Sequence, residues 1–235
     1  MHMVSNYLYT VVEKKLEGEG VMTLTLTLPD GGIPPFVSGQ YITIYFPETG
    51  VKEGKAYSIS SAPHEKRLSI TIKEMGLFSG MLCNLESGDT VEGSLPYGFF
   101  YSEEENTTLV LLASGIGVTP LYSLLNDVLY KNSARNVHLV YSVKYEKDIL
   151  FLEQLQELVD KHPSFSFVVH ITQEEAKSSW SKKGRISVKE VVDTFGCSID
   201  TEYFMCGSIA FVRDMWRDMR REGVPEECVY TEAFF

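Results

Sequence analysis

The chain has 235 residues, 44% of them hydrophobic, so it is long enough to bury the core of one large domain or of two ordinary ones. Its formal net charge of −11 argues against a nucleic-acid-binding protein, which would carry a basic stripe. No apolar run reaches the length of a membrane span and no signal peptide is visible, so we expect a cytoplasmic protein.

The cysteines lie far apart in the sequence, and none forms a Cys-x-x-Cys pair. This spacing favours neither a zinc site nor an iron–sulfur cluster, so we predict that the chain holds no metal. Reduced thiols also agree with a cytoplasmic location. The four residues are Cys83, Cys197, Cys206 and Cys228.

The first part of the chain, from Tyr7 to about Tyr101, is predicted to consist of short strands separated by turns. Apolar residues alternate with threonines over residues 21–28, as they do in a half-buried strand. Further strands are predicted at residues 41–46, 56–60 and 68–73. Many short strands at close spacing predict a β barrel or a β sandwich, and we favour an antiparallel barrel.

A glycine-rich turn follows a buried strand in the middle of the chain. The strand is predicted at residues 108–113, and Gly115 and Gly117 lie in the turn, where the missing Cβ atoms let backbone N–H groups approach a ligand. We expect Thr119 to cap the next helix and Pro120 to occupy its first turn. The free N–H groups and dipole of such a helix suit a pyrophosphate, although similar turns also occur without a ligand.

Strands and helices alternate in the rest of the chain. Strands are predicted at residues 136–142, 165–171 and 203–206, and helices at 149–161, 187–195 and 209–222. This alternation predicts a parallel sheet covered on both faces by helices. We therefore expect two domains, an antiparallel β barrel at residues 1–103 and a nucleotide-binding α/β domain at residues 104–235.

Six motifs in succession resemble those of the ferredoxin–NADP reductase family of flavoproteins. They lie at residues 36–41 (Phe-x-x-Gly-Gln-Tyr), 55–61 (Lys-x-Tyr-Ser-x-x-Ser), 76–79 (Gly-x-x-Ser), 114–120 (Ser-Gly-x-Gly-x-Thr-Pro), 206–208 (Cys-Gly-Ser) and 232–234 (Glu-x-Phe). The resemblance covers nearly the whole chain. It implies a barrel that binds FAD and an α/β domain that binds NADH or NADPH.

The resemblance implies a flavin site in the barrel. Tyr57 would stack on the flavin ring, and Ser58 would hydrogen-bond the flavin N5. Without the motif, both residues could belong to an ordinary barrel strand. Lys55 stands where the family usually has arginine, and it offers the flavin pyrophosphate a point charge in place of a fork. The predicted flavin-binding residues are Lys55, Ala56, Tyr57, Ser58, Ile72, Lys73, Gly76, Phe78 and Ser79.

The resemblance also implies a hydride-transfer site. Cys206 would lie beside the nicotinamide as a positioning residue, although a lone cysteine after an apolar strand can also be a buried hydrophobe. Phe234 would cover the flavin where the nicotinamide must stack, and Phe235 would not. The predicted nucleotide-binding residues are Gly115, Gly117, Thr119, Pro120, Cys206, Gly207 and Phe234. The predicted catalytic residues are Ser58, Cys206, Glu232 and Phe234.

The choice between NADH and NADPH depends on residues 172–175, Thr-Gln-Glu-Glu, which stand where the family often has a serine–arginine pair for the 2′-phosphate. Carboxylates favour ribose hydroxyls and repel a phosphate, so the stretch favours NADH. Four nearby cations remain candidate phosphate contacts: Lys144, Lys182, Lys183 and Arg185.

Three functions are compatible with these features. The first is an NAD(P)H-dependent flavoprotein reductase that passes electrons to a separate acceptor, such as a ferredoxin or an oxygenase component. The second is a free-flavin reductase, in which flavin is a substrate. The third is a non-catalytic subunit that senses nucleotides. The terminal Glu232-Ala233-Phe234 favours the first function, and the net charge makes an acidic ferredoxin a less easy partner.

Overall fold

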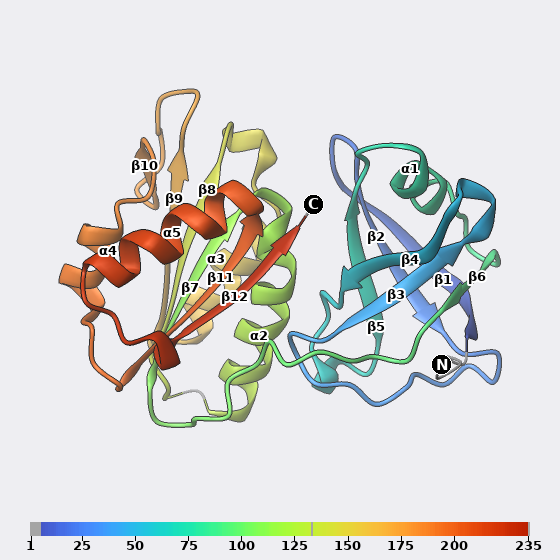
Figure 1. Ribbon diagram of the computed structural model, residues 1–235, viewed down its shortest axis with the longest axis horizontal. Helices are drawn as coiled ribbons and strands as arrows, with labels where there is room; N and C mark the ends of the chain where they lie inside the picture. The colour runs from blue at the N-terminus through green and yellow to red at the C-terminus, as the bar shows by residue number, and fades with distance from the viewer. Residues whose placement is uncertain (1–5, 133, 235) are drawn as a thin grey trace. The chain divides into compact units, whose positions relative to one another are not determined.

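The computed structural model describes residues 6–132 and 134–234 and divides into two compact units. The first unit extends to Tyr101 and also includes Tyr122–Asp127, and the second contains Ser102–Leu121 and the chain from Val128 onward. In Figure 1 the chain passes from the blue strands of the first unit to the green-to-red strands and helices of the second. The two units are described separately below.

The first unit is built on one six-stranded antiparallel sheet. Its strands have the order β4-β3-β6-β1-β2-β5, and every pair of neighbours is antiparallel. The strands are β1 (Tyr7–Gly18), β2 (Val21–Thr27), β3 (Tyr41–Phe46), β4 (Val51–Ser58), β5 (Leu68–Lys73) and β6 (Thr90–Gly93). This confirms the predicted antiparallel fold, and β3 and β5 have the predicted bounds.

Leucines and threonines alternate along β2, so one face of the strand turns to the core and the other carries hydroxyl groups. Leu24 and Leu26 are fully buried in the barrel core, together with residues of β3 and β5. Thr25, which lies between them, points to the other face, where its Oγ1 lies 3.0 Å from Ser69 Oγ. The hydroxyl of Thr25 is therefore satisfied although its side chain is buried.

A short helix, α1 (Leu77–Cys83), follows β5, and no helix was predicted there. Its apolar residues Phe78 and Leu82 pack into the barrel core, and this packing stabilises a helix too short to be stable by itself. The remaining turns of this unit include the 3₁₀ helices η1 (Pro47–Thr49) and η2 (Pro63–Glu65).

The second unit is a parallel α/β sheet, as the alternation predicted. The strand order is β10-β9-β8-β7-β11-β12, and all neighbours are parallel. The strands are β7 (Thr108–Ser114), β8 (Val137–Val143), β9 (Phe165–Ile171), β10 (Ser181–Lys183), β11 (Thr201–Ser208) and β12 (Val229–Phe234). Because β7 has β8 on one side and β11 on the other, the strand order reverses at β7. Ligands of such sheets bind at the carboxyl ends of the strands at this point.

Helices cover both faces of the parallel sheet (Figure 1). They are α2 (Val118–Lys131), α3 (Leu152–Lys161), α4 (Val188–Phe195) and α5 (Ile209–Arg221), with the 3₁₀ helices η3 (Gly115–Gly117), η4 (Glu146–Asp148) and η5 (Glu226–Cys228). Under α4 and α5, the sheet residues Val110, Leu112 and Met205 form an apolar core with Val191 and Val212. In the described parts of the chain, no helix has the length and apolar character needed to cross a membrane.

Two predicted helix starts are wrong. The helix predicted from residue 149 begins at Leu152, because Phe151 has a φ of 60° that a helix cannot contain. Thr119 does not cap α2. The helix begins at Val118 after the turn of η3, and the Thr119 hydroxyl donates to the Ile116 carbonyl at 2.8 Å. Pro120 lies in the first turn as expected.

Candidate functional site

Four of the predicted flavin-binding residues come together between β4 and α1. Lys55 and Tyr57 are two residues apart in β4, so both side chains point to the face that α1 covers. The Tyr57 ring stacks on Phe78 with centroids 6.4 Å apart and planes inclined by 23°. Lys55 Nζ lies 5.6 Å from the centroid of the same Phe78 ring. We call these residues, together with Ser79, the β4–α1 cluster.

The turn before α1 is held by Ser79. Its hydroxyl accepts a hydrogen bond from the Met75 N–H at 2.8 Å and donates to the Gly76 carbonyl at 3.2 Å. Gly76 has a φ of 154°, which L-residues rarely adopt, and the place where a Cβ would stand is open space. No side chain caps α1, so N–H groups of its first turn remain for another acceptor.

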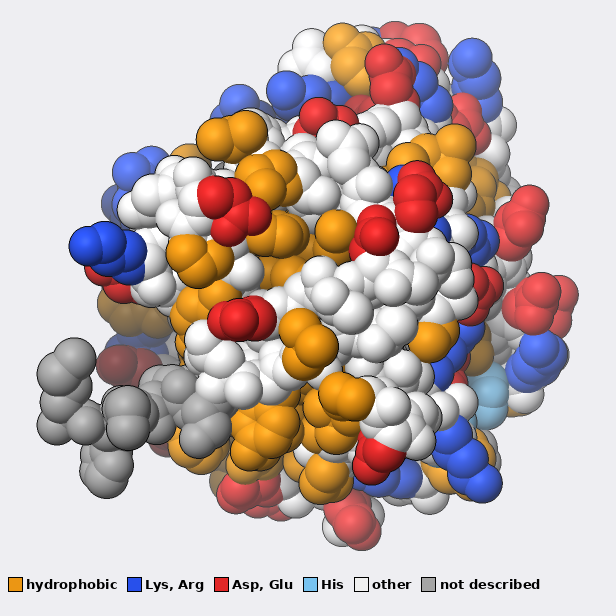
Figure 2. Space-filling view, turned by 90° about the vertical axis from the view of Figure 1, so that its right-hand side faces the viewer, with side chains coloured by type: hydrophobic (Ala, Val, Ile, Leu, Met, Phe, Trp, Pro, Cys, Tyr) orange, Lys and Arg blue, Asp and Glu red, His pale blue; other side chains and the backbone are white. Residues whose placement is uncertain are grey.

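Exposed apolar residues flank this turn. Met75 is 71% and Leu77 70% exposed, although both are large hydrophobic side chains. Figure 2 shows a face of the molecule on which hydrophobic side chains gather among a few acidic and basic ones. Our sequence prediction did not include Met75 or Leu77. Their position on either side of the predicted Gly76 could have indicated them, because a ligand-binding turn often carries exposed apolar residues.

The other predicted flavin residues of the barrel lie apart from the β4–α1 cluster or face elsewhere. Ser58 is buried at the end of β4, and Ala56 is exposed; both alternate with Tyr57 and so point to the opposite face of the strand. Ile72 is 1% exposed within the barrel core, so only its backbone remains for a ligand. Lys73 is exposed at the end of β5.

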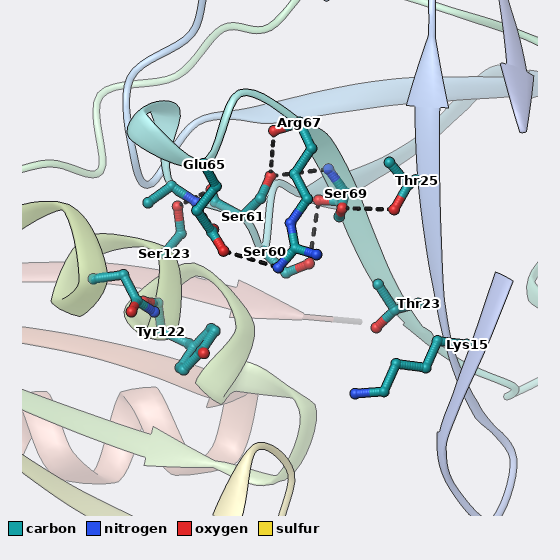
Figure 3. Close-up of polar contacts among 12 residues, drawn as sticks. Lys15, Thr23, Thr25, Ser60, Ser61, Glu65, Arg67, Ser69, Tyr122 and Ser123 are labelled. Atoms are coloured by element: carbon teal, nitrogen blue, oxygen red, sulfur yellow. Dashed lines mark hydrogen bonds and ion pairs between the residues drawn. The ribbon is translucent and has the colours of Figure 1, made fainter. Parts of the chain in front are cut away.

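The residues that follow Ser58 are fixed by a network of hydroxyl groups (Figure 3). Ser60 Oγ accepts from the Thr71 hydroxyl at 2.9 Å, and Ser61 Oγ accepts from the Ser69 N–H at 2.9 Å. From α2, the Ser123 hydroxyl donates to the Ser61 carbonyl at 2.6 Å. The sequence prediction missed this network. Its signal is the density of serines and threonines in residues 58–61 and 69–71.

In the second unit, the glycine turn lies at the carboxyl end of β7, where the strand order reverses. Gly115 has a φ of 55°, and a Cβ there would meet open space. A Cβ on Gly117 would stand 2.3 Å from the Cys206 carbonyl oxygen. Gly117 is therefore required for the approach of the turn to β11, independently of any ligand, whereas Gly115 is required for its backbone conformation.

The carboxyl ends of β11 and β12 carry the predicted hydride-transfer residues. The strand register pairs Cys206 with Glu232 and Ser208 with Phe234. A Cβ on Gly207 would stand 2.9 Å from both Ser114 Cβ and the Phe211 ring, so this glycine is also required by packing. Phe234 is partly buried, and Phe235 lies outside the described residues.

Cys206 is fully buried. Burial, together with the nearby Glu232 carboxylate, raises the pKa of its thiol well above the usual value. The thiol therefore stays protonated at neutral pH, and a protonated thiol is a poor nucleophile.

The two carboxylates predicted to repel a 2′-phosphate are both engaged. Glu174 Oε1 accepts a hydrogen bond from the Glu146 N–H at 2.5 Å, and Glu175 forms an ion pair with Lys183. Thr172 donates its hydroxyl to the Val143 carbonyl at 3.1 Å. Lys183, one of the four candidate phosphate contacts, is therefore already paired with a carboxylate.

A polar row crosses the same edge of the sheet and was not predicted. The parallel register aligns Ser114 of β7 with Ser142 of β8, Ser142 with His170 of β9, and His170 with Lys182 of β10. Burial and the charge of Lys182 lower the pKa of His170, so its ring is neutral at pH 7. Sequence spacing could not reveal the row, because its residues meet only through the register of four strands.

Comparisons with known proteins agree with this geometry. Residues 111–217 match the family model of an oxidoreductase NAD-binding domain. The chain is 28% identical over 247 residues to a flavohemoprotein of Chromobacterium violaceum, covering 96% of this chain and 60% of the relative. It is 28% identical over 203 residues to the toluate 1,2-dioxygenase electron transfer component of Pseudomonas putida, covering 85% of this chain and 59% of that protein.

A solved structure matches over nearly the whole chain. The flavohem-like FAD/NAD-binding domain of nitric oxide dioxygenase from Vibrio cholerae O1 biovar El Tor superposes with a TM-score of 0.85 at 26% identity. The match covers 97% of this chain and 98% of that domain. The chain thus spans about 60% of the length of the two curated relatives and almost all of the isolated domain.

Proposed function

Because the chain is an FAD/NAD-binding reductase module of the ferredoxin–NADP reductase type, we propose that it passes hydride from NADH to bound FAD and then electrons to a separate acceptor. FAD would bind in residues 1–103, and the dinucleotide in residues 104–235. The observation that carries this proposal is the β4–α1 cluster, which groups a cation, two aromatic rings and an uncapped helix start.

The β4–α1 cluster has the donor set that FAD needs. Lys55 and the free N–H groups of α1 would bind the pyrophosphate, and the Tyr57 ring would support the flavin. When bound, FAD supplies the redox chemistry, since its ring accepts a hydride and releases electrons singly or in pairs. Ser58 would orient the ring edge from the other face of β4. The hydroxyl network behind Ser58 would keep this serine in place.

The carboxyl edge of the parallel sheet has the groups that a dinucleotide needs. The open turn at Gly115 and the start of α2 would bind the pyrophosphate through backbone N–H groups. Cys206 would position the nicotinamide with a protonated, unreactive thiol, and Glu232 would shape the site from the neighbouring strand. Phe234 would cover the flavin until the nicotinamide displaces its ring.

The preference for NADH is supported by charge. Glu174 and Glu175 hold two carboxylates where a 2′-phosphate would lie, and Lys183 is already paired with Glu175. Lys182 is the lysine of the polar row, and it is exposed on the edge strand β10. Steady-state kcat/KM with each nucleotide tests this preference, and a higher value with NADPH would overturn it.

The name of one relative supports a particular kind of electron acceptor. The name of the toluate 1,2-dioxygenase electron transfer component supports an oxygenase component as the acceptor of this chain, and a ferredoxin is the alternative acceptor. Lys55 favours a second candidate, a free-flavin reductase, because a single ammonium group binds a pyrophosphate with looser geometry than an arginine fork.

The visible spectrum of the purified protein tests the function directly. We expect a bound flavin that runs as FAD on chromatography and is bleached by NADH in the absence of oxygen. A protein that binds no added flavin would exclude the proposal. A flavin that stays oxidised with NADH and NADPH would favour a nucleotide-sensing subunit. A flavin that is reduced but dissociates in each turnover would favour the free-flavin reductase.

A further inference from the structure

The side chain of Tyr141 reaches from β8 to the glycine turn that follows β7. Tyr141 is fully buried, and the parallel register pairs it with Ala113, two residues before Gly115. Its hydroxyl donates a hydrogen bond to the Gly115 carbonyl at 3.0 Å. Both residues belong to the second unit, in whose sheet β7 and β8 are neighbours (Figure 1). The contact joins residues 26 positions apart, so it exists only because the two strands pair.

The Tyr141 hydroxyl is engaged as a donor and as an acceptor. It donates to Gly115, and it accepts a long hydrogen bond of 3.5 Å from the Leu150 N–H. Burial raises the pKa of the hydroxyl, so the group keeps its proton at neutral pH and remains a donor. A buried hydroxyl whose two partners are both fixed holds one orientation. The Gly115 carbonyl is therefore held by a fixed group of the sheet.

The peptide plane that follows Gly115 has more freedom than an ordinary peptide. Gly115 has a φ of 55°, and a glycine adopts backbone conformations of either sign of φ at little cost. The plane between Gly115 and Ile116 therefore has two accessible orientations. The Val118 N–H also bonds the Gly115 oxygen, and together with Tyr141 it occupies both lone pairs of that oxygen. These two donors select one orientation of the plane.

The fixed carbonyl determines where the N–H of the same peptide points. In a planar trans peptide the C=O and the N–H point in opposite directions. Because the Gly115 carbonyl points towards the Tyr141 hydroxyl, the Ile116 N–H points away from it. Thr119 acts in the same way on the next peptide, since its hydroxyl holds the Ile116 carbonyl at 2.8 Å and so directs the Gly117 N–H.

The turn thus presents two consecutive N–H groups to the outside. The first N–H groups of a helix have no partner within it, and successive N–H groups in a turn form a concavity that binds anions. Gly115 and Ile116 are half-buried, so a ligand can reach this side of the turn. The place where a Cβ of Gly115 would stand is open space.

We propose that Tyr141 is a positioning residue for the dinucleotide pyrophosphate: its hydroxyl holds the Gly115 carbonyl back, so that the turn presents N–H groups to the phosphate oxygens. This proposal rests on the proposed function, which puts the pyrophosphate at this turn. A flipped peptide would turn the partly negative Gly115 oxygen towards the phosphates and repel them. Tyr141 acts through Gly115 on binding, and it takes no part in hydride transfer.

Removing only the hydroxyl tests the proposal. The full chain, loaded with FAD, is titrated with ADP-ribose, which has the pyrophosphate but no nicotinamide, and with AMP, which lacks the pyrophosphate. We expect Tyr141→Phe to raise the Kd of ADP-ribose about threefold to tenfold, the effect of one hydrogen bond, and to leave that of AMP unchanged. The KM for NADH should rise by the same factor at an unchanged kcat, because the turn binds the ground state and the transition state equally. A lower kcat at an unchanged KM would overturn the proposal.

A second buried tyrosine of the same unit is the matched control. Tyr203 of β11 is fully buried, and its hydroxyl also donates to a glycine carbonyl, that of Gly196 at the end of α4. Tyr203→Phe should lower the Tm about as much as Tyr141→Phe does, and it should leave the Kd of ADP-ribose and the KM for NADH unchanged. If Tyr203→Phe weakens ADP-ribose as much as Tyr141→Phe, the effect is one of stability and the proposal is wrong.

Amide resonances of the wild type give a measurement that holds even if Tyr141→Phe does not fold. ADP-ribose should shift the N–H signals of Ile116 and Gly117, because both groups are directed at the phosphates. AMP should leave the two signals in place. If ADP-ribose binds without shifting them, the N–H groups are not the contact and the proposal is overturned.

Flavin reduction separates this proposal from the proposed function. If ADP-ribose binds the wild type through the turn but NADH does not reduce the flavin, the proposed function fails and the role of Tyr141 stands. If NADH reduces the flavin and Tyr141→Phe has the wild-type KM and Kd values, the proposed function stands and the role of Tyr141 is wrong. A wild type that binds neither ADP-ribose nor NADH would overturn both.

Discussion

The proposed flavin site of the first unit consists of side chains, whereas the proposed dinucleotide site of the second unit consists of backbone that glycines leave uncovered. Lys55, Tyr57 and Phe78 contribute a charge and two rings. Gly115 and Gly117 contribute a conformation and a close approach. The difference predicts different responses to substitution. Side-chain sites lose affinity in proportion to the group removed, and backbone sites lose function most where an added Cβ would collide with neighbouring backbone.

Gly117→Ala is expected to have the largest effect. The new Cβ would stand 2.3 Å from the Cys206 carbonyl, so backbone must move, at a cost of about 2–3 kcal/mol. Thermal unfolding should show the loss of stability, and NADH should no longer reduce the flavin efficiently. Gly115→Ala is the matched control, because its Cβ meets open space and only the φ of 55° is strained. If both substitutions lower the stability equally, the close approach of Gly117 to β11 is not the cause of the loss.

Tyr57→Ala tests the side-chain site. Removing the ring should raise the dissociation constant of FAD about tenfold, since the stacking of aromatic rings contributes about 0.5–1.5 kcal/mol beyond the buried area. Fluorescence of the released flavin measures this constant. Tyr57→Phe keeps the ring and should bind FAD nearly as the wild type does. If Tyr57→Phe loses as much affinity as Tyr57→Ala, the hydroxyl rather than the ring is the contact.

Phe234→Ala tests a side chain that would act on both ligands, because the Phe234 ring would cover the flavin where the nicotinamide must lie. The substitution should let NADH bind about threefold to tenfold more tightly and strengthen the charge-transfer band, because no ring has to be displaced. Flavin should dissociate more readily. Phe235→Ala is the control, and the same changes there would show that the wrong ring was chosen.

The smallest expected effect is a pH dependence of stability at Cys206. Its folded pKa lies well above the usual value of 9.0, because burial disfavours the thiolate. Above pH 9 the unfolded thiol loses its proton while the folded thiol keeps it, so the free energy of unfolding falls as the pH rises. Cys206→Ala should lose less stability than the wild type between pH 8 and about pH 10. Identical pH slopes in the two proteins would contradict the raised pKa.

The sequence by itself determined the two fold types and many of their elements, although it did not predict α1, β6 or β10. Strands β3, β5 and β9 have the predicted bounds, because alternation and short apolar runs are local patterns that burial requires. The two fold types, antiparallel and then parallel, followed from the change in this pattern near residue 104. The motif at residues 55–61 predicted that Lys55 and Tyr57 belong to one flavin site, and the structure places both beside the Phe78 ring.

Only the tertiary structure decided which contacts these residues make. α1 exists because Phe78 and Leu82 pack on strands far away in the sequence, and Gly117 is required because β11 approaches it. The engagement of Glu174 by the Glu146 N–H and the polar row through His170 depend on the register of neighbouring strands. Glu146 and Glu174 lie 28 positions apart, as do Ser142 and His170, so no local pattern contains these contacts. Packing and register are properties of the whole sheet, and this is why they appear only in the folded chain.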